Sequence, residues 1–240
     1  MRHYFTFDGI KSSDYGVLIS GENTFGAPAR DIDEIVVPGR DGNLTIDNGR
    51  FSAASVIYPA FIPETAKANL QGLRNALMAK RGHRMLQDSL HPDEFYSAYY
   101  EKGLEPEMTA NLLHSSLEIE FTRDPRRFLV AGNKAYSVPT TATVLAPFEM
   151  YNPTLFESSP LIRVYGTGVL HVNNMTITVT GTYTYIDIDT EIGDCYFGAT
   201  NANDKVTFSG YGYPKLVPGS NAFYYTDFSA VEVTPRWWRL

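Results

Sequence analysis

Five histidines and one acidic run are the side chains in this sequence whose types suggest metal chemistry. The histidines lie in separate segments, and no two have the His-x-x-x-His spacing with which a helix holds zinc. Scattered histidines are more often surface or half-buried residues than ligands. The sequence therefore predicts no histidine metal site, and the residues concerned are His3, His83, His91, His114 and His171.

The acidic run from Asp187 to Asp194 invites comparison with a calcium-binding EF-hand loop. Such a loop needs glycine at its sixth position and glutamate at its twelfth, where this sequence has Ile192 and Gly198. The run alternates between isoleucine and acidic residues, which is typical of a strand with one solvated face. We therefore expect an ordinary strand with Asp187, Asp189 and Glu191 on the solvated face.

The remaining signals for catalysis are weak. Cys195 is the one cysteine, so it has no disulfide partner within the chain, and its acidic and aromatic neighbours would not stabilise a thiolate. The Gly-x-Gly pairs at 166–168 and 210–212 lack the strand–helix context of a phosphate loop and are interpreted as turns. A glycosidase pair of carboxylates can come from distant segments, and nothing in the sequence selects one. We predict no catalytic residue, no cofactor and no metal, and hence not an enzyme.

The charge distribution argues against a nucleic-acid-binding protein. The net charge is −7, and the 20 basic residues are scattered apart from short clusters at 80–84 and 123–127. A nucleic-acid clamp needs a basic stripe that displaces counterions. The apolar runs fall far short of the ~20 residues that span a bilayer, and the first residues resemble no secretory signal. We therefore expect synthesis in a cytoplasm and no membrane association.

Short β-branched and aromatic runs dominate the first half of the chain. Dipeptides that favour hairpin turns separate them, at Asp8-Gly9, Asp41-Gly42 and Asn48-Gly49. The pattern predicts an antiparallel meander. One hairpin folds around Gly39, Arg40, Asp41 and Gly42, with Asp41-Gly42 at its tip setting the register.

One segment has helical periodicity. Residues 63–81 place Ala66, Leu70, Leu73 and Leu77 on one stripe, with Pro63 at the first helical position, Glu64 in the first turn, Lys80 and Arg81 in the last turn and Gly82 as the stop. The alternation in residues 116–122 then predicts a strand that buries Leu117, Ile119 and Phe121. The protein should be mainly β with one long helix. Its N-terminal domain, residues 1–135, should be an α+β barrel or sandwich with the helix over an opening.

A second domain follows a change in composition. Residues 136–147 are rich in Thr, Ala, Ser and Pro, which favours an extended linker. Residues 148–240 then carry short strands at roughly ten-residue spacing without helices, which predicts a β-sandwich of jelly-roll or related type.

The aromatic content leaves a second function open. The chain has 16 Tyr and 14 Phe against 2 Trp, and tyrosine is common at protein interfaces and on sugar-binding surfaces. The alternative hypothesis is therefore a carbohydrate-binding module that engages cell-surface glycans, with Tyr183, Tyr185, Trp237 and Trp238 as candidate contacts.

Several segments, taken together and in order, resemble the distal tail protein (Dit) family of long-tailed, non-contractile bacteriophages. The most specific are the Val-Pro-Gly-Arg-Asp-Gly hairpin at 37–42, the helix around 70–73 and the Pro-Lys-Leu-Val-Pro-Gly-Ser-Asn run at 214–221. The other carriers are residues 7–17, 93–99, 117–125, 152–166 and 231–238. The resemblance covers nearly the whole chain.

The resemblance implies a structural virion protein of a phage or prophage, made in the bacterial cytoplasm and located at the tail tip. The N-terminal domain would form a homohexameric ring, or two rings back to back, and the C-terminal domain would be a galectin-like β-sandwich facing outward. The implied partners are the tail tube protein and a tail-tip hub protein of the tail-associated lysin type, with host-wall glycan as a further candidate. DNA would pass through the channel without specific binding.

A ring requires a patch on each subunit to meet a different patch on the next. Hairpins with free edges suit such contacts, because an exposed edge can pair with another chain. The interface candidates are therefore Gly39, Arg40, Asp41 and Gly42.

Overall fold

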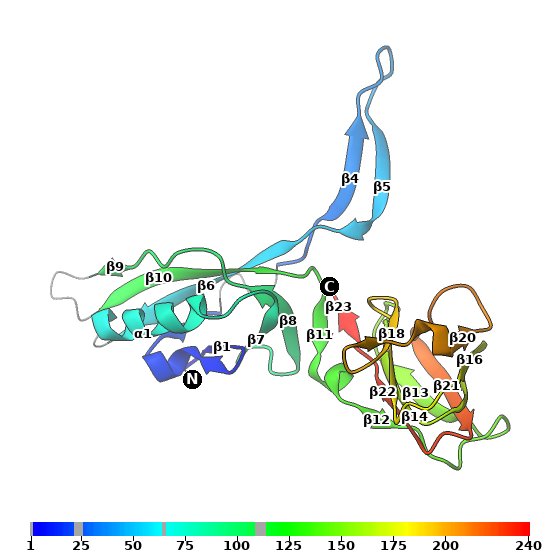
Figure 1. The fold of residues 1–240 in the computed structure, drawn as a ribbon. Coiled ribbons are helices and arrows are strands. Elements are labelled where there is room, and N and C mark those ends of the chain that lie inside the picture. The colour runs from blue at the N-terminus through cyan, green and yellow to red at the C-terminus, as the bar shows by residue number, and fades with distance from the viewer. Residues whose placement is uncertain (1, 22–25, 64–65, 109–113) are drawn as a thin grey trace. The chain divides into compact units, whose positions relative to one another are not determined.

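The computed structural model describes residues 2–21, 26–63, 66–108 and 114–240 and divides into two compact units (Figure 1). One unit comprises residues 1–127 and Leu240, and the other comprises residues 128–239. Each has its own hydrophobic core. The mainly β composition with one α-helix in the described ranges confirms the predicted fold class.

The division between the units lies earlier than the sequence indicated. Residues 128–135, expected in the first domain, belong to the second unit, and so does the expected linker 136–147. The reason is that this segment packs: β12 (Tyr136–Ser137) pairs with β22 (Ala230–Thr234), and Val138 and Ala142 are buried in the second core.

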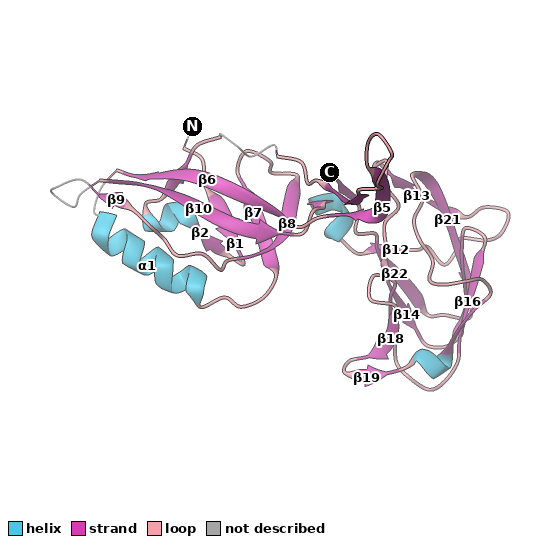
Figure 2. Ribbon diagram, turned by 90° about the horizontal axis from the view of Figure 1, so that it is seen from above, coloured by secondary structure: helices cyan, strands magenta, loops and turns pink. Residues whose placement is uncertain are grey.

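The first unit is an antiparallel sheet with a helix over one face (Figure 2). Its strand order is β2-β1-β7-β8-β10-β6-β3, with β9 paired to β10. The bounds are β1 (Phe5–Phe7), β2 (Ile10–Lys11), β3 (Leu18–Ile19), β6 (Ala54–Ile62), β7 (Arg84–Asp88), β8 (Glu94–Tyr99), β9 (Glu107–Met108) and β10 (Ser115–Arg123). A 3-10 turn, η1 (Ser12–Tyr15), follows β2.

The long pairing of β6 with β10 organises the first core. Its register runs without a break from Ser115 opposite Ile62 to Arg123 opposite Ala54. Leu117, Ile119 and Phe121 are buried as predicted. On the same face the ring of Phe121 packs edge-on against Phe5 at 5.3 Å between centroids. The alternation of side chains along the strand thus directs one row of β10 into the core.

The helix α1 (Ala66–Met78) packs its leucine stripe into this core, since Leu70, Leu73 and Leu77 are 4%, 0% and 0% exposed. It ends earlier than predicted, and Lys80 lies beyond it in an ion pair with Asp8 at 2.8 Å. Gly82 has a positive φ of 70°, but it lies four residues beyond the last residue of α1, so it does not end the helix as expected. The prediction for Glu64 lies outside the described residues. No helix in the described part of the chain has the length and apolarity needed to cross a bilayer.

The second unit consists of two sheets that share one core, which is the predicted β-sandwich. One sheet has the order β12-β22-β14-β17-β18-β19 and the other β13-β21-β15-β16-β20. Ile162, Val164, Leu170, Val172 and Phe223 fill the space between them. The bounds are β13 (Phe148–Asn152), β14 (Leu161–Tyr165), β15 (Gly168–Val172), β16 (Met175–Val179), β17 (Ile186–Asp189), β18 (Asp194–Phe197), β19 (Thr200–Asn201), β20 (Val206–Phe208) and β21 (Gly219–Thr226). The 3-10 turns η2 (Val130–Asn133) and η3 (Asn203–Lys205) complete this unit. Two further short strands, β11 (Arg127–Leu129) and β23 (Trp238–Arg239), lie outside its two sheets and pair with each other.

The acidic strand β17 differs from its prediction. It alternates as expected, but its acidic face is not solvated, because Asp187 and Asp189 are only 4% and 6% exposed. Arg163 donates two hydrogen bonds to Asp187, at 2.7 and 2.8 Å. Arg236 donates two to Asp189, at 2.6 and 2.8 Å. Such paired hydrogen bonds allow a carboxylate to be buried while charged.

The Asp189–Arg236 pair predicts a loss of stability in acid. Burial would raise the pKa of Asp189, but the hydrogen bonds and charge of Arg236 outweigh it and hold that pKa below its ordinary value. A carboxylate with a lowered folded pKa stabilises the fold above its unfolded pKa, and this contribution is lost as the pH falls through the folded pKa. We expect Asp189→Asn to lower the free energy of unfolding of the second unit by about 1–3 kcal/mol at pH 7.

Tryptophan fluorescence during urea unfolding measures the free energy of unfolding of the second unit, because Trp237 and Trp238 both lie in that unit. The difference from the wild type should shrink as the pH falls below about 4, the ordinary pKa of an unfolded aspartate, towards the lower folded pKa of Asp189. Asp227→Asn, at an exposed aspartate in the same unit, is the control and should change little. An equal difference at pH 7 and pH 3 would contradict the assignment.

Candidate assembly surface

The predicted hairpin forms a two-stranded sheet of its own, β4 (Arg30–Ile35) and β5 (Leu44–Phe51) (Figure 1). We call residues 30–51 the arm. Within the described part of the chain its two strands pair only with each other, so each keeps a free edge. The strands are longer than the short runs expected from the sequence, because cross-strand polar pairs extend them through charged positions.

The tip of the arm consists of residues 36–43, which connect Ile35 to Leu44, the last two residues that pair across the strands. The backbone N–H of Arg40 donates to the carbonyl of Val37 at 3.2 Å. With Pro38 next and Gly39 at a φ of 80°, this is a type II turn. The hydrogen-bonded turn therefore lies at residues 37–40 and not at Asp41-Gly42, which was expected to set the register from the tip. Gly42 instead supplies a second left-handed position, with a φ of 79°.

The three Asx-Gly dipeptides adopt three different structures. Asp8-Gly9 joins the pair Phe7↔Ile10 with both φ angles positive, as a two-residue hairpin should. Asn48-Gly49 was also expected to be a turn, but it lies inside β5, where residues 48–50 oppose Asp31 in a bulge. The dipeptide thus marks a left-handed position in each case, whereas strand pairing decides its role.

One face of the arm is apolar toward its tip. Ile35 lies opposite Leu44 and Asp33 opposite Ile46, so Ile35, Leu44 and Ile46 share that face. Val36 and Val37 continue the apolar surface into the tip. Together with Ile32 on the other face, these aliphatic side chains are between 36% and 76% exposed. Clustered exposed aliphatic residues on a folded protein mark an interaction surface.

The base of the arm is held by polar contacts across the strands. Arg50 contacts Asp31 at 2.5 Å, Asn48 donates to Asp33 at 3.1 Å, and Arg30 contacts Asp47 at 3.3 Å. The hydrogen bonds from Arg50 and Asn48 lower the pKa of Asp31. Exposed ion pairs stabilise little, typically about 0–1 kcal/mol each. A lone hairpin is marginal in water, so a partner that covers its apolar face would stabilise the arm substantially.

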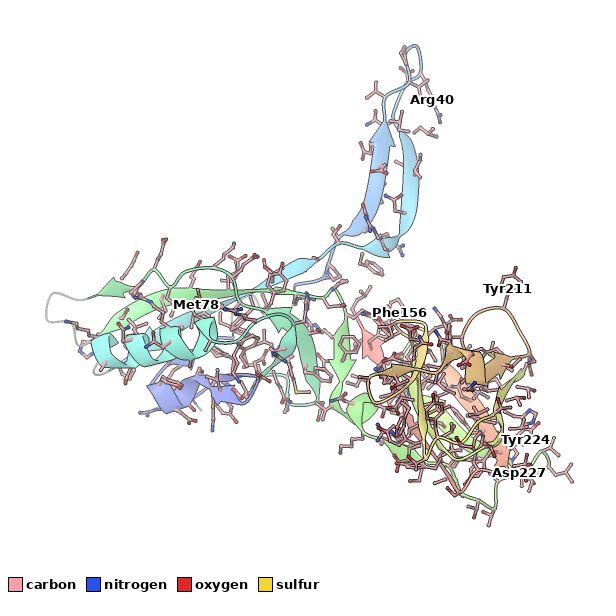
Figure 3. The ribbon with its side chains drawn as sticks, in the orientation of Figure 1. Arg40, Met78, Phe156, Tyr211, Tyr224 and Asp227 are labelled. Atoms are coloured by element: carbon pink, nitrogen blue, oxygen red, sulfur yellow. The ribbon has the colours of Figure 1, made fainter. Side chains whose placement is uncertain are left out.

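The four interface candidates lie together at the tip, and the structure gives the two glycines a conformational role. Arg40 projects at the outer end of the arm (Figure 3). In the described ranges neither Arg40 nor Asp41 has a side-chain hydrogen bond or ion pair. The aliphatic residues around them were not singled out by sequence reasoning. Their alternation with charged residues resembles any half-buried strand, so only the free arm reveals their exposure.

The aromatic residues proposed for glycan contact are engaged with their own unit. Tyr185 lies over the guanidinium of Arg163 at 4.5 Å. Trp238 stacks on Phe156 at 4.3 Å between centroids and donates to the carbonyl of Glu157 at 2.9 Å. Trp237 is 7% exposed, and Tyr183 packs against Phe197. These contacts are the ordinary packing of a β domain and do not favour the glycan hypothesis.

The other residues considered for chemistry also have structural roles. The ring of His171 stacks on Tyr224 at 4.3 Å, and His91 pairs with Asp88 at 3.0 Å. The described residues contain no group of three His, Cys, Asp or Glu that could hold a metal ion. Cys195 is a buried strand residue, and burial together with the charge of Asp194 raises the pKa of its thiol to about 12. The thiol is therefore protonated at neutral pH.

Comparison with known proteins identifies solved structures that share this fold. The sequence matches no protein-family model and no curated protein. This chain is similar to the crystal structure of SPP1 Dit (gp 19.1), which is described as a paradigm of the hub adsorption apparatus in phages infecting Gram-positive bacteria. The TM-score is 0.68 at 14% sequence identity, and the match covers 97% of this chain and 98% of that one. The phage p2 baseplate in its activated conformation with Sr is similar with a TM-score of 0.50 and 10% identity, covering 100% and 98% of the two chains. The chain therefore has the fold of a Dit protein along nearly its whole length, as the sequence resemblance predicted.

Proposed function

We propose that this chain is a structural virion protein of a phage or prophage tail. It forms a homohexameric ring at the distal end of the tail and joins the tail tube to the tail-tip apparatus. The observation that carries the proposal is the likeness to SPP1 Dit, which spans both units and is nearly complete in both chains. A fold shared from end to end supports a shared role more strongly than one common domain would, since single β domains serve many functions.

The arm supports self-assembly independently of the fold comparison. Its aliphatic residues and two free strand edges lack cover within the described chain. A ring of identical subunits needs a heterologous contact, in which one patch meets a different patch on the next subunit. An arm on the first unit provides such a patch. We assign Gly39, Arg40, Asp41 and Gly42, with the aliphatic residues beside them, to the contact between subunits.

The proposed partners follow from a position in the tail. The ring of first units contacts the tail tube protein and a tail-tip hub protein of the tail-associated lysin type, while the second units face outward. Two rings can also stack back to back. The net charge of −7 per chain favours a channel through which DNA passes without specific binding, because like charges repel. The role is structural rather than catalytic, in keeping with the hub and baseplate proteins of the same fold.

The ring is tested with the purified wild-type protein. We expect light scattering over a range of concentrations to give the mass of a hexamer or of two hexamers. Negative-stain electron microscopy should show six-fold particles with a central hole. A protein that stays monomeric at high concentration would contradict the proposed ring.

The role of the arm in assembly is tested by a polar variant. The combined change Ile35→Thr, Leu44→Thr and Ile46→Thr keeps β-propensity but removes apolar area from one face of the arm. We expect the assembled fraction to fall at least about tenfold, because burial of this area would drive association. The thermal unfolding midpoints should stay close to those of the wild type, since the arm contributes nothing to either core.

The matched control changes the same kind of residue elsewhere. Val144→Thr, Leu145→Thr and Leu155→Thr alter three aliphatic residues of the second unit that are 68%, 94% and 90% exposed. This control should assemble normally. Equal loss of assembly in both triple variants would show that the arm has no special role.

The geometry of the tip is tested at Gly42. A Cβ added there meets no atom within 4 Å, so the cost of Gly42→Val arises only from its φ of 79° and amounts to about 1–2 kcal/mol. We expect faster amide hydrogen exchange in residues 36–46 and weaker assembly, with unchanged exchange in both cores. Gly42→Asn is the control, because asparagine tolerates this conformation. Normal assembly of the valine variant would argue against a role for the tip.

A further inference from the structure

The first unit carries an open groove of about 1060 Å³ on the face of its sheet opposite the helix. On β6 the residues Tyr58 and Ile62 point into the core with the helix, so Pro59 and Phe61 point the other way. Phe61 lies on the groove and is 49% exposed. In Figure 2 the strands β6, β10 and β9 that carry this face lie side by side.

The strand register arranges the groove in rows. One row crosses four strands, from Leu18 on β3 to Phe61 on β6, Ser116 on β10 and Glu107 on β9. The next row places Pro59 on β6 opposite Glu118 on β10. Residues opposite each other point to the same face. The groove therefore has an apolar side at β3 and β6 and an acidic side at β10 and β9.

The acidic side carries charge that the unit does not neutralise. Four glutamates line the groove, and Glu120 is paired with Lys102 at 2.6 Å. The side-chain carboxylates of Glu105, Glu107 and Glu118 have no hydrogen bond or ion pair in the parts of the chain that the structure describes. An apolar floor beside uncompensated carboxylates fits a partner segment that carries aliphatic residues and a cation.

We infer that the groove of one subunit receives the tip of the arm from a second copy of this chain. The tip presents Val36 and Val37 beside Arg40, whose guanidinium has no partner among the described side chains. In the docked pair, Arg40 faces Glu107 and Glu118, and the valines pack on Phe61 and Leu18. This inference rests on the proposed self-assembly and names the surface that receives the arm.

Two features of the single chain support this occupant. No residue of the arm lines the groove, so the chain does not fill its own groove in this structure. The tip and the groove are also different patches, so their contact is heterologous. Such a contact generates a ring when the rotation between neighbouring subunits closes, whereas a patch that pairs with itself gives a two-fold dimer.

The test exchanges charges between the two patches. In Arg40→Glu an acidic tip meets the acidic groove. In Glu118→Arg a basic residue in the groove meets the basic tip. We expect each variant alone to need at least about tenfold more protein than the wild type to assemble, because like charges in a contact disfavour it. Asp93→Arg, at an exposed carboxylate outside the groove, is the control and should assemble as the wild type does.

Mixing the two single variants in equal amounts is the decisive experiment. In an alternating ring every glutamate tip meets an arginine groove and every arginine tip meets a glutamate groove, so assembly should return to near the wild-type level. The double variant Arg40→Glu with Glu118→Arg should also assemble by itself. Rescue in the double variant without rescue in the mixture would mean that the tip docks within its own chain and would overturn the inference.

The outcomes separate this inference from the proposed function. Normal assembly of both single variants would not contradict the proposed ring. It would show that the groove receives something other than the tip, such as a segment of another tail protein. A wild-type protein that never assembles would overturn both. Circular dichroism of each variant should match the wild type, as expected for changes at exposed side chains.

Discussion

The unbroken pairing of β6 with β10 is the constraint on which the first unit depends. It sets which side chains of both strands enter the core with the helix and which line the opposite face. A slip of one residue would exchange the two sets, moving Phe121 and Tyr58 to solvent and Glu118 and Phe61 into the core. The same register therefore determines both the stability of the unit and the acidic groove. Because β6 also follows directly after the arm, it connects the two patches proposed to meet in the assembly.

The arm combines opposite requirements in one hairpin. Its polar base, with Arg50 against Asp31 and Arg30 against Asp47, keeps the free strand soluble and discourages unspecific pairing of its edges. Its apolar tip favours burial against a partner. Neither part contributes to the cores of the units, so changes in the arm can alter association without unfolding the chain. This separation makes the assembly hypotheses testable with folded variants.

The second unit shows how buried polar groups stabilise loops that few apolar contacts hold. Asn221 is fully buried, and its side chain bonds to the backbone of Val217 and Gly219 and to the amide of Asn173. Asn152 similarly joins the carbonyls of Phe156 and Leu216. With the two Arg–Asp pairs on β14, β17 and the segment after β22, these contacts satisfy polar groups that would be costly if left unpaired. Removing one partner would therefore leave a buried polar group unpaired and destabilise the unit.

Periodicity in the sequence was sufficient to determine the helix stripe at Leu70, Leu73 and Leu77, the buried face of β10 and the sandwich of the second unit, because these patterns reflect local geometry. Gly42 and Gly82 likewise have the left-handed conformation that the sequence predicted for them. The sequence alone could not tell the turn at Asp8-Gly9 from the bulge at Asn48-Gly49, nor foresee that Arg163 and Arg236 would cover the acidic face of β17. Nor could it separate the exposed aliphatic residues of the arm from those of a buried strand. These features depend on which distant segments meet, and only the tertiary structure decides that, because contacts between residues far apart leave no local pattern.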